Sequence, residues 1–80
     1  MRVIVKLFAG LKNYAPVTGL PGTPFEIELS EGSTLQDVVA HLNLPKEEVK
    51  IAFVNGIIQE MDCVLKSGDE IGIFPPVGGG

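Results

Sequence analysis

The sequence predicts an α+β fold in which one main helix packs across a mixed sheet of four to five strands. Short segments rich in β-branched or alternating apolar residues outnumber the single segment with helical spacing. This pattern favours a helix that covers one face of a sheet. The chain has 80 residues, of which 45% are hydrophobic, and this length and composition suit one domain with one core.

The first predicted strand covers residues 2–9, and the second covers residues 25–29. Alternation divides the side chains of the first strand between two faces, one with Val3, Val5 and Leu7 and the other with Ile4, Lys6 and Phe8. Residues 10–24 contain several glycines and prolines, so we expect a long loop there. The second strand alternates acidic and apolar residues, which predicts a hairpin with one face in water.

The single predicted helix begins near residue 33, where two capping boxes fit the sequence. One pairs Ser33 with Gln36, and the other pairs Thr34 with Asp37 one residue later. Apolar residues follow at helical spacing, and Pro45 ends the helix soon after. These apolar residues are Leu35, Val38, Val39 and Leu42.

The remaining predicted strands are short. Residues 51–54 form an apolar run that ends at Asn55-Gly56, a pair typical of tight hairpin turns. Residues 57–58 can return as a short strand.

The last predicted strand covers residues 70–74. The next two residues, Pro75 and Pro76, end its pairing because proline has no N–H to donate. We therefore predict a domain over residues 1–74 and a flexible C-terminal tail over residues 75–80.

The charge and the single cysteine limit the function classes. A net charge of −4 and an isoelectric point near 4.7 argue against a nucleic-acid partner. No segment approaches the length of a membrane span, so we expect no membrane partner. One cysteine allows no internal disulfide, and the N-terminus lacks the features of a signal peptide. These features predict a cytoplasmic protein.

Side chains suited to catalysis are scarce. The sequence has no phosphate-binding loop, dinucleotide-binding motif or Cys-x-x-Cys pair. Its one histidine, His41, falls near the predicted helix end, where a capping role is expected. Its one cysteine, Cys63, is read as a small packed thiol. We therefore predict no metal site and no cofactor bound by the chain itself.

The unusual segment is the tail, which ends in three glycines. Its six residues would reach about 20 Å when extended, which suits threading a narrow tunnel in a partner. The α-carboxylate of Gly80 is ionised at neutral pH and can attack an activated phosphate. A frayed terminus or an expression scar is the alternative reading of the same residues.

Residues 65–80 resemble the C-terminus of the MoaD family, the small subunits of molybdopterin synthase. The shared pattern is a Gly-Asp-Glu turn, a strand, Phe-Pro-Pro-Val, one small residue and Gly-Gly. Residues 5–9, 34–35 and 54–56 also fit this family, whereas Gly78 stands where it often has Ala or Thr. The wider family includes the thiamine sulfur carrier ThiS and shares the ubiquitin-like β-grasp fold. Phe-Pro-Pro favours the MoaD branch.

This resemblance implies that the working group is the C-terminal carboxylate of Gly80. An E1-like (MoeB-like) enzyme would adenylate it with ATP, and a sulfur donor would convert it to a thiocarboxylate. The tail would then enter the large subunit of molybdopterin synthase (MoaE-like) and give its sulfur to a pterin precursor. The tail residues that thread this site would be Pro75, Pro76, Val77, Gly78 and Gly79. On this account the chain is a sulfur donor without catalytic side chains.

Strand alternation predicts a partner-binding patch made by Ile4, Phe8 and Phe74. In a β-grasp sheet the first and last strands are parallel neighbours, so these residues would gather on the outer face at the root of the tail. Exposed apolar and aromatic groups of this kind mark interfaces, and the resemblance implies the same role for Phe8 and Phe74. In the alternative, one or both rings bend into a secondary core under the long loop.

Several functions share this tail chemistry. Sulfur transfer in thiamine synthesis or tRNA thiolation is one alternative, and conjugation of Gly80 to lysines of other proteins is a second. A third alternative is an inert β-grasp interaction module. The acceptor, the choice between molybdenum and tungsten, the oligomeric state and the role of residues 10–24 are not determined by the sequence.

Overall fold

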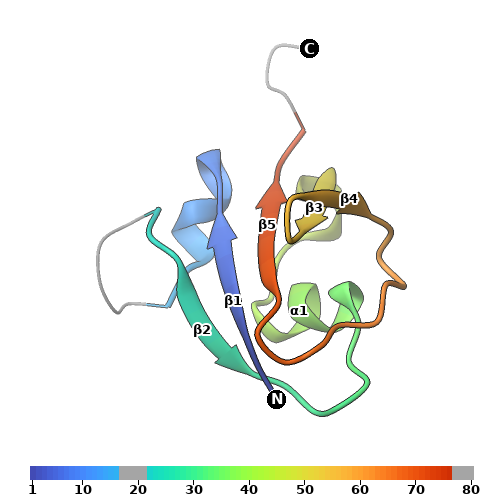
Figure 1. Ribbon diagram of the computed structural model, residues 1–80. Coiled ribbons are helices and arrows are strands. Elements are labelled where there is room, and N and C mark those ends of the chain that lie inside the picture. Colours follow the sequence, from blue (N-terminus) through green and yellow to red (C-terminus); the bar gives the residue numbers. More distant parts are fainter. Residues whose placement is uncertain (17–21, 77–80) are drawn as a thin grey trace.

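The computed structural model describes residues 1–16 and 22–76. Within these residues the predicted α+β fold is confirmed, with a five-stranded sheet and one α-helix (Figure 1). In chain order the elements are β1 (Arg2–Leu7), the 3₁₀ helix η1 (Ala9–Tyr14), β2 (Phe25–Glu28), α1 (Leu35–His41), the 3₁₀ helix η2 (Lys46–Glu48), β3 (Ile51–Val54), β4 (Ile57–Gln59) and β5 (Glu70–Phe74).

The sheet is mixed, with the strand order β2-β1-β5-β3-β4. The first and last strands are parallel neighbours as expected, with Val5 opposite Ile71. The other three pairings are antiparallel, and β1 and β2 form the predicted pair with Val3 opposite Ile27. Because β1 and β5 lie side by side in the centre of the sheet, the start of the domain adjoins the segment that precedes the tail.

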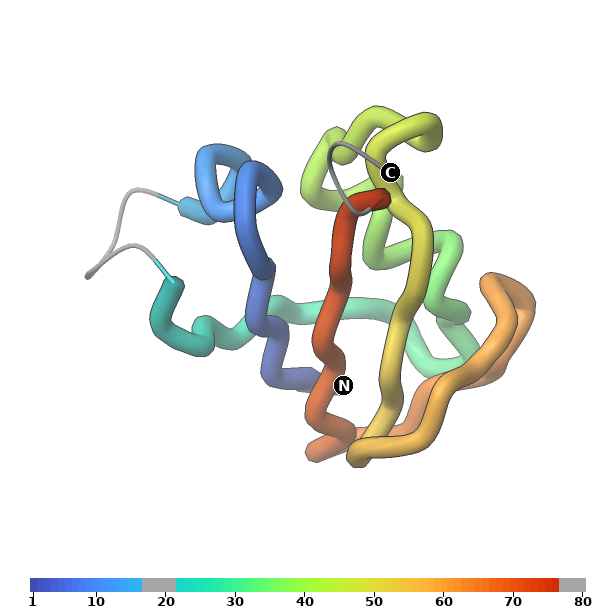
Figure 2. Tube along the Cα trace, turned by 90° about the horizontal axis from the view of Figure 1, so that it is seen from above, coloured from blue at the N-terminus to red at the C-terminus, as the bar shows by residue number. Residues whose placement is uncertain are grey.

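Helix α1 packs on one face of the sheet, and the core lies between them (Figure 2). Residues of β1 and β5 that alternate toward the helix are buried, as strand alternation predicts. The buried set includes Val3, Val5, Leu7, Ile27, Leu35, Val38, Val39, Ala52, Val54, Leu65, Ile71 and Ile73. The opposite face of the sheet carries no helix among the described residues, so its side chains form the surface.

The prediction of an unbroken loop over residues 10–24 is wrong for its first part. Residues Ala9–Tyr14 form the 3₁₀ helix η1, and Leu11 within it is fully buried. Ala9 turns the chain with a φ of 51°, which ends the first strand two residues earlier than predicted. The apolar side chain of Leu11 therefore adds to the core from a segment whose glycines and prolines indicated only a loop. Residues 17–21 lie outside the described residues.

Both ends of α1 follow from local side-chain chemistry. Thr34 is the N-cap, and the Asp37 carboxylate accepts hydrogen bonds from the Thr34 backbone N–H at 2.8 Å and from its hydroxyl at 3.2 Å. This decides between the two capping boxes in favour of the later one. At the other end Asn43 has a φ of 56°, and the Leu44 N–H donates to the Val39 carbonyl. This is a Schellman ending, so the helix ends before Pro45 is reached.

The turn between β3 and β4 is formed by Asn55 and Gly56, which have φ values of 52° and 85°. Both residues lie in the left-handed region that a two-residue hairpin turn requires, as their sequence predicts. The Asn55 side chain also donates to the Asp69 carboxylate and accepts from the Glu70 N–H, each at 3.0 Å. The hairpin is thereby attached to the start of β5.

Candidate functional site

The three residues of the predicted patch lie on the outer face of the sheet. Ile4 belongs to β1 and Phe74 to β5, and Phe8 follows β1 with its N–H bonded to the Ile73 carbonyl at 3.1 Å. This extra bond continues the parallel pairing by one residue, so Phe8 lies beside Phe74. Their rings stack with centroids 4.0 Å apart and planes inclined by 7°. Both rings are half-buried on this outer face, and neither belongs to the buried core between the sheet and α1.

Phe53 on β3 is a third aromatic residue of this face, and the sequence did not predict it. Its ring meets Phe74 edge to face, with centroids 5.5 Å apart and an angle of 70°. The neighbours Ala52 and Val54 are buried on the helix side, so alternation turns Phe53 outward. Because residues 51–54 are all apolar, alternation separates Phe53 from Ala52 and Val54 but does not show which of the two sets faces outward. These three residues, Phe8, Phe53 and Phe74, are called the aromatic cluster below.

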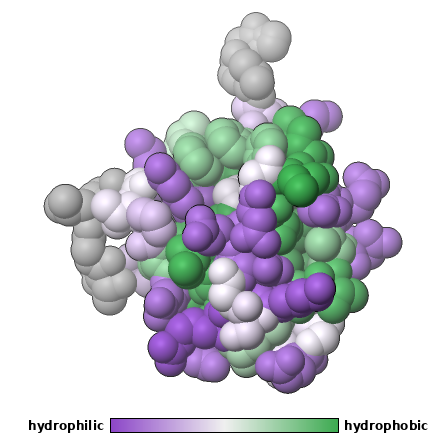
Figure 3. Space-filling view, viewed as in Figure 1, coloured by the Kyte–Doolittle hydropathy of each residue, from purple (hydrophilic) through white to green (hydrophobic). Residues whose placement is uncertain are grey.

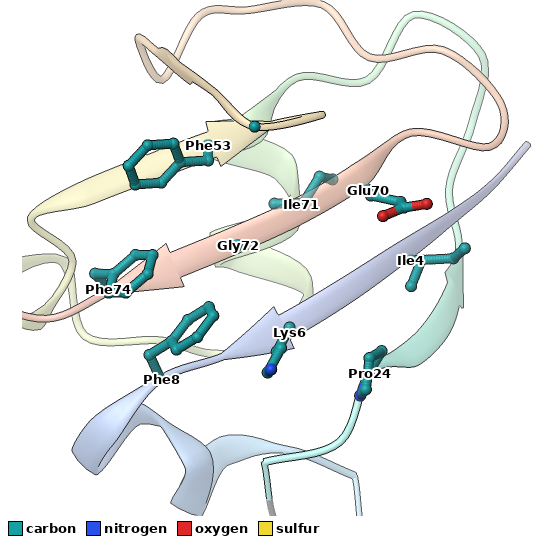
Figure 4. Close-up of a pocket in the computed structure, with 10 residues that line it drawn as sticks. Ile4, Lys6, Phe8, Pro24, Phe53, Glu70, Ile71, Gly72 and Phe74 are labelled. Carbon is teal, nitrogen blue, oxygen red and sulfur yellow. The ribbon is translucent and has the colours of Figure 1, made fainter.

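A hollow of about 420 Å³ opens beside the aromatic cluster, with Gly72 among its lining residues. Figure 4 shows the three rings at one end of the hollow and Ile4 and Glu70 at the other. Gly72 lies opposite both Lys6 and Phe53 in the sheet, so it occupies the centre of this face. Since glycine has no side chain, the sheet is bare there and the surrounding side chains form walls.

Two charged side chains border the hollow. The Lys6 ammonium lies 5.0 Å from the centroid of the Phe8 ring, a cation–π contact. Glu70 borders the opposite end, across from Ile4. No ion pair of Lys6 or Glu70 is present among the described residues. Both side chains are exposed, so a molecule that docks on this face would meet their charges.

Apolar surface continues from the aromatic cluster toward β4. Ile58 lies opposite Phe53 in the sheet, and its side chain is 60% exposed. Its neighbour Ile57 is 63% exposed but lies opposite Val54, which is buried on the helix side, so alternation directs Ile57 away from this face. Figure 3 shows hydrophobic groups gathered toward the β3–β4 end of one face, with hydrophilic groups beside and below them. A continuous apolar patch of this kind is typical of a protein-binding surface.

The described residues contain no group of three or more His, Cys, Asp or Glu side chains arranged to hold a metal. His41 is exposed at the end of α1, as predicted, and Cys63 is half-buried with its thiol near the Val64 carbonyl. Within the described ranges, no helix has the length and hydrophobicity needed to cross a bilayer.

The predicted tail begins directly beside the aromatic cluster. Phe74 is the last residue of β5, and its carbonyl accepts a hydrogen bond from the Lys50 N–H at 2.9 Å. Pro75 is half-buried and Pro76 is exposed. The other predicted tail residues, Val77, Gly78, Gly79 and Gly80, lie outside the described residues. The face therefore adjoins the point where the tail leaves the sheet.

Comparisons with known proteins agree with this geometry. The model of the ThiS family matches residues 5–80. A Pyrococcus furiosus protein assigned as subunit 1 of a molybdopterin converting factor is 32% identical, with a TM-score of 0.73, and the match covers 95% of this chain and 98% of that one. No curated protein sequence matches the chain.

Two further solved structures are similar. Subunit 1 in a Helicobacter pylori complex of subunits 1 and 2 of molybdopterin-converting factor is 26% identical over the full length of both chains, with a TM-score of 0.63. The small archaeal modifier protein 1 of Haloferax volcanii is 24% identical over the full length of both chains, with a TM-score of 0.72. At 24% identity, the similarity to the Haloferax volcanii protein shows a shared fold only.

Proposed function

This chain belongs to the ThiS family, whose members include MoaD-like and ThiS-like ubiquitin-like sulfur carriers, and from that premise we propose that it carries sulfur as a thiocarboxylate on Gly80. We propose further that it donates this sulfur in molybdopterin synthesis, as the small subunit of molybdopterin synthase. The observation that carries the choice of pathway is the 32% identity to the Pyrococcus furiosus subunit 1 over nearly the whole of both chains. The segment Phe74-Pro75-Pro76-Val77 supports the same choice.

The chemistry proposed for Gly80 has two steps before transfer. An E1-like enzyme joins the carboxylate to the α-phosphate of ATP, which forms an acyl-adenylate and releases pyrophosphate. A donor at the oxidation level of hydrosulfide then attacks the carbonyl carbon. The bond from that carbon to the phosphate oxygen breaks, AMP leaves, and loss of a proton gives the thiocarboxylate. This chain supplies the acyl group, and both ATP and the sulfur donor are handled by its partners.

The outer face of the sheet would hold the chain on those partners. The aromatic cluster lies at the root of the tail, so a protein docked there receives the tail beside its own contact surface. The Helicobacter pylori subunit 1 forms a complex with subunit 2, which supports a large subunit as one occupant of this face. An E1-like enzyme is the second proposed occupant, at a different stage of the cycle.

Intact mass spectrometry tests the proposal. The protein is incubated with its E1-like enzyme, ATP and a sulfur source, and the expected product is heavier by the exchange of one oxygen for one sulfur. Deletion of Gly80 should abolish the shift, and Gly10→Ala should retain it, because that glycine lies far from the tail in sequence and has open space around it. A wild-type mass that stays unchanged, under conditions in which the enzyme activates a known carrier, contradicts the proposal.

The acceptor is tested separately. The thiocarboxylated chain is offered to the large subunit with a pterin precursor, to a thiazole synthase, and to a tRNA thiolation enzyme. Sulfur loss only with the large subunit supports the molybdopterin pathway. Attachment of Gly80 to lysines of other proteins, seen as a branched peptide after digestion, would instead support a modifier function.

A further inference from the structure

Gly72 is placed where any side chain would disturb the aromatic cluster. A Cβ added to Gly72 would lie 3.3 Å from Cε2 of Phe8 and 3.8 Å from Cε1 of Phe74. The first distance is tighter than ordinary van der Waals contact, so the Phe8 ring would have to move. The absence of a side chain at Gly72 thus allows two rings to stack at 4.0 Å above β1 and β5 and keeps the sheet bare beside them.

The glycine is not required by the backbone at this position. Gly22, Gly32, Gly56 and Gly68 all have positive φ values, and Gly72 does not. A glycine inside a strand ordinarily weakens it and often marks a place where another group approaches the backbone closely. The open hollow beside Gly72 gives that group a place to sit.

We propose that the hollow beside Gly72 receives one apolar side chain from the protein that docks on this face, and that Gly72 sets the size of the side chain it accepts. This inference rests on the proposed function, because the docking protein is taken to be the large subunit. It goes further by assigning the contact to a residue outside the patch of Ile4, Phe8 and Phe74.

The lining determines the chemistry of the inserted group. The walls are the aromatic cluster and Ile4, which favour an apolar side chain. The hollow is open on a sheet face, and its two charged side chains lie apart, with Lys6 beside Phe8 and Glu70 at the end near Ile4. It therefore lacks the converging polar groups and the enclosure by which small-molecule sites hold a ligand. An apolar side chain that is held in place by the rest of a partner protein needs neither converging polar groups nor enclosure.

Lys6 adds a charge requirement to the partner. Its ammonium lies against the Phe8 ring and has no ion pair among the described residues. A partner carboxylate next to the inserted apolar side chain would meet it at the border of the hollow. The occupant is thus an apolar side chain flanked by an acidic residue.

The test compares Gly72 with a matched glycine. Affinities for the large subunit of molybdopterin synthase are measured for wild type, Gly72→Ala, Gly72→Val, and the same two substitutions at Gly10, around which a Cβ would meet nothing within 4 Å. We expect Gly72→Ala to weaken binding about tenfold, which corresponds to about 1.4 kcal/mol, and Gly72→Val to weaken it more, since overfilling a packed site is destabilising. Both Gly10 variants should bind like wild type. Thermal unfolding of each free variant checks that the fold is intact.

Two outcomes overturn the inference without touching the proposed function. In the first, Gly72→Val binds like wild type while Phe74→Ala binds weakly, so the face is used and the hollow is not. In the second, the Gly72 variants lose no more affinity than the matched Gly10 variants. A Lys6→Gln variant tests the charge requirement: its affinity should depend less on salt than that of wild type. If the affinities of Lys6→Gln and wild type depended equally on salt, the partner would have no acidic residue opposite Lys6.

Discussion

Phe8 and Phe74 stack face to face, with ring centroids 4.0 Å apart, and so join the first and last strands of the sheet on its outer face (Figure 4). Such ring pairs contribute about 0.5–1.5 kcal/mol beyond the area that they bury. Both side chains are half-buried, so part of their surface is left for another molecule. Because Phe74 is followed directly by Pro75, the position of the stack also sets where the tail begins.

Phe74→Ala should weaken binding to the large subunit by about 30-fold, since truncation of a central interface aromatic commonly costs about 2 kcal/mol or more. The variant also loses ring contacts with Phe8 and Phe53. We expect the free domain to stay folded because Phe74 lies outside the buried core. Titration calorimetry gives the affinity, and thermal unfolding gives the stability.

The control for this variant is Val64→Ala. Val64 is 61% exposed, and its backbone pairs with Thr34 at the start of α1, so its substitution removes apolar surface elsewhere. Equal affinities of the Phe74→Ala and Val64→Ala variants would show that the aromatic cluster is not part of the interface.

Leu11→Ala should destabilise the domain by about 2–5 kcal/mol, the range for truncating a buried leucine. Leu11 is fully buried although it lies in a segment that the sequence marks as a loop. Urea unfolding measures the change, and the adjacent exposed residue gives the control, because Lys12→Ala should alter the free energy of unfolding by less than about 0.5 kcal/mol. A Leu11 variant as stable as the Lys12 variant would mean that η1 is not part of the core.

Leu11 also shows where prediction from the sequence fails. It is an isolated apolar residue between Gly10 and Lys12, in a segment without helical or strand periodicity. Only tertiary packing against the sheet decides that such a residue is buried. The strands, by contrast, were predictable, because two-residue alternation is a geometric property of any extended chain and fixes which side chains face the helix.

The candidate site was partly predictable for the same reason. Alternation along the first and last strands placed Ile4, Phe8 and Phe74 on one face, and the structure brings Phe8 and Phe74 into contact. Phe53 was missed because residues 51–54 are apolar throughout, which hides the alternation. The role proposed for Gly72 depends on its distances to the rings of Phe8 and Phe74, and no sequence pattern supplies these.

Asn55 is predicted to stabilise the hairpin in two separable ways, through its positive φ and through its bonds to Asp69 and Glu70. Asn55→Gly keeps the conformation and loses the bonds, so we expect a loss of about 1 kcal/mol. Asn55→Ala loses both and should cost about 1 kcal/mol more. Chemical unfolding of the three proteins measures these differences. Equal stabilities of the glycine variant and wild type would assign the whole effect to the backbone.

Asp37 offers a direct test of which capping box starts α1. Its carboxylate accepts from the Thr34 N–H at 2.8 Å, so Asp37→Ala should cost about 1 kcal/mol. Gln36→Ala removes the corresponding residue of the alternative box and should change stability by a few tenths of a kcal/mol at most, roughly the difference in helix propensity. Asp37→Asn keeps an acceptor oxygen and loses the negative charge, which is favourable at a helix N-terminus. An Asn variant that lies between wild type and the Ala variant, and approaches wild type at high salt, would assign part of the effect to charge. If Gln36→Ala lowered the free energy of unfolding more than Asp37→Ala, the helix in solution would begin one residue earlier, with Ser33 as its N-cap.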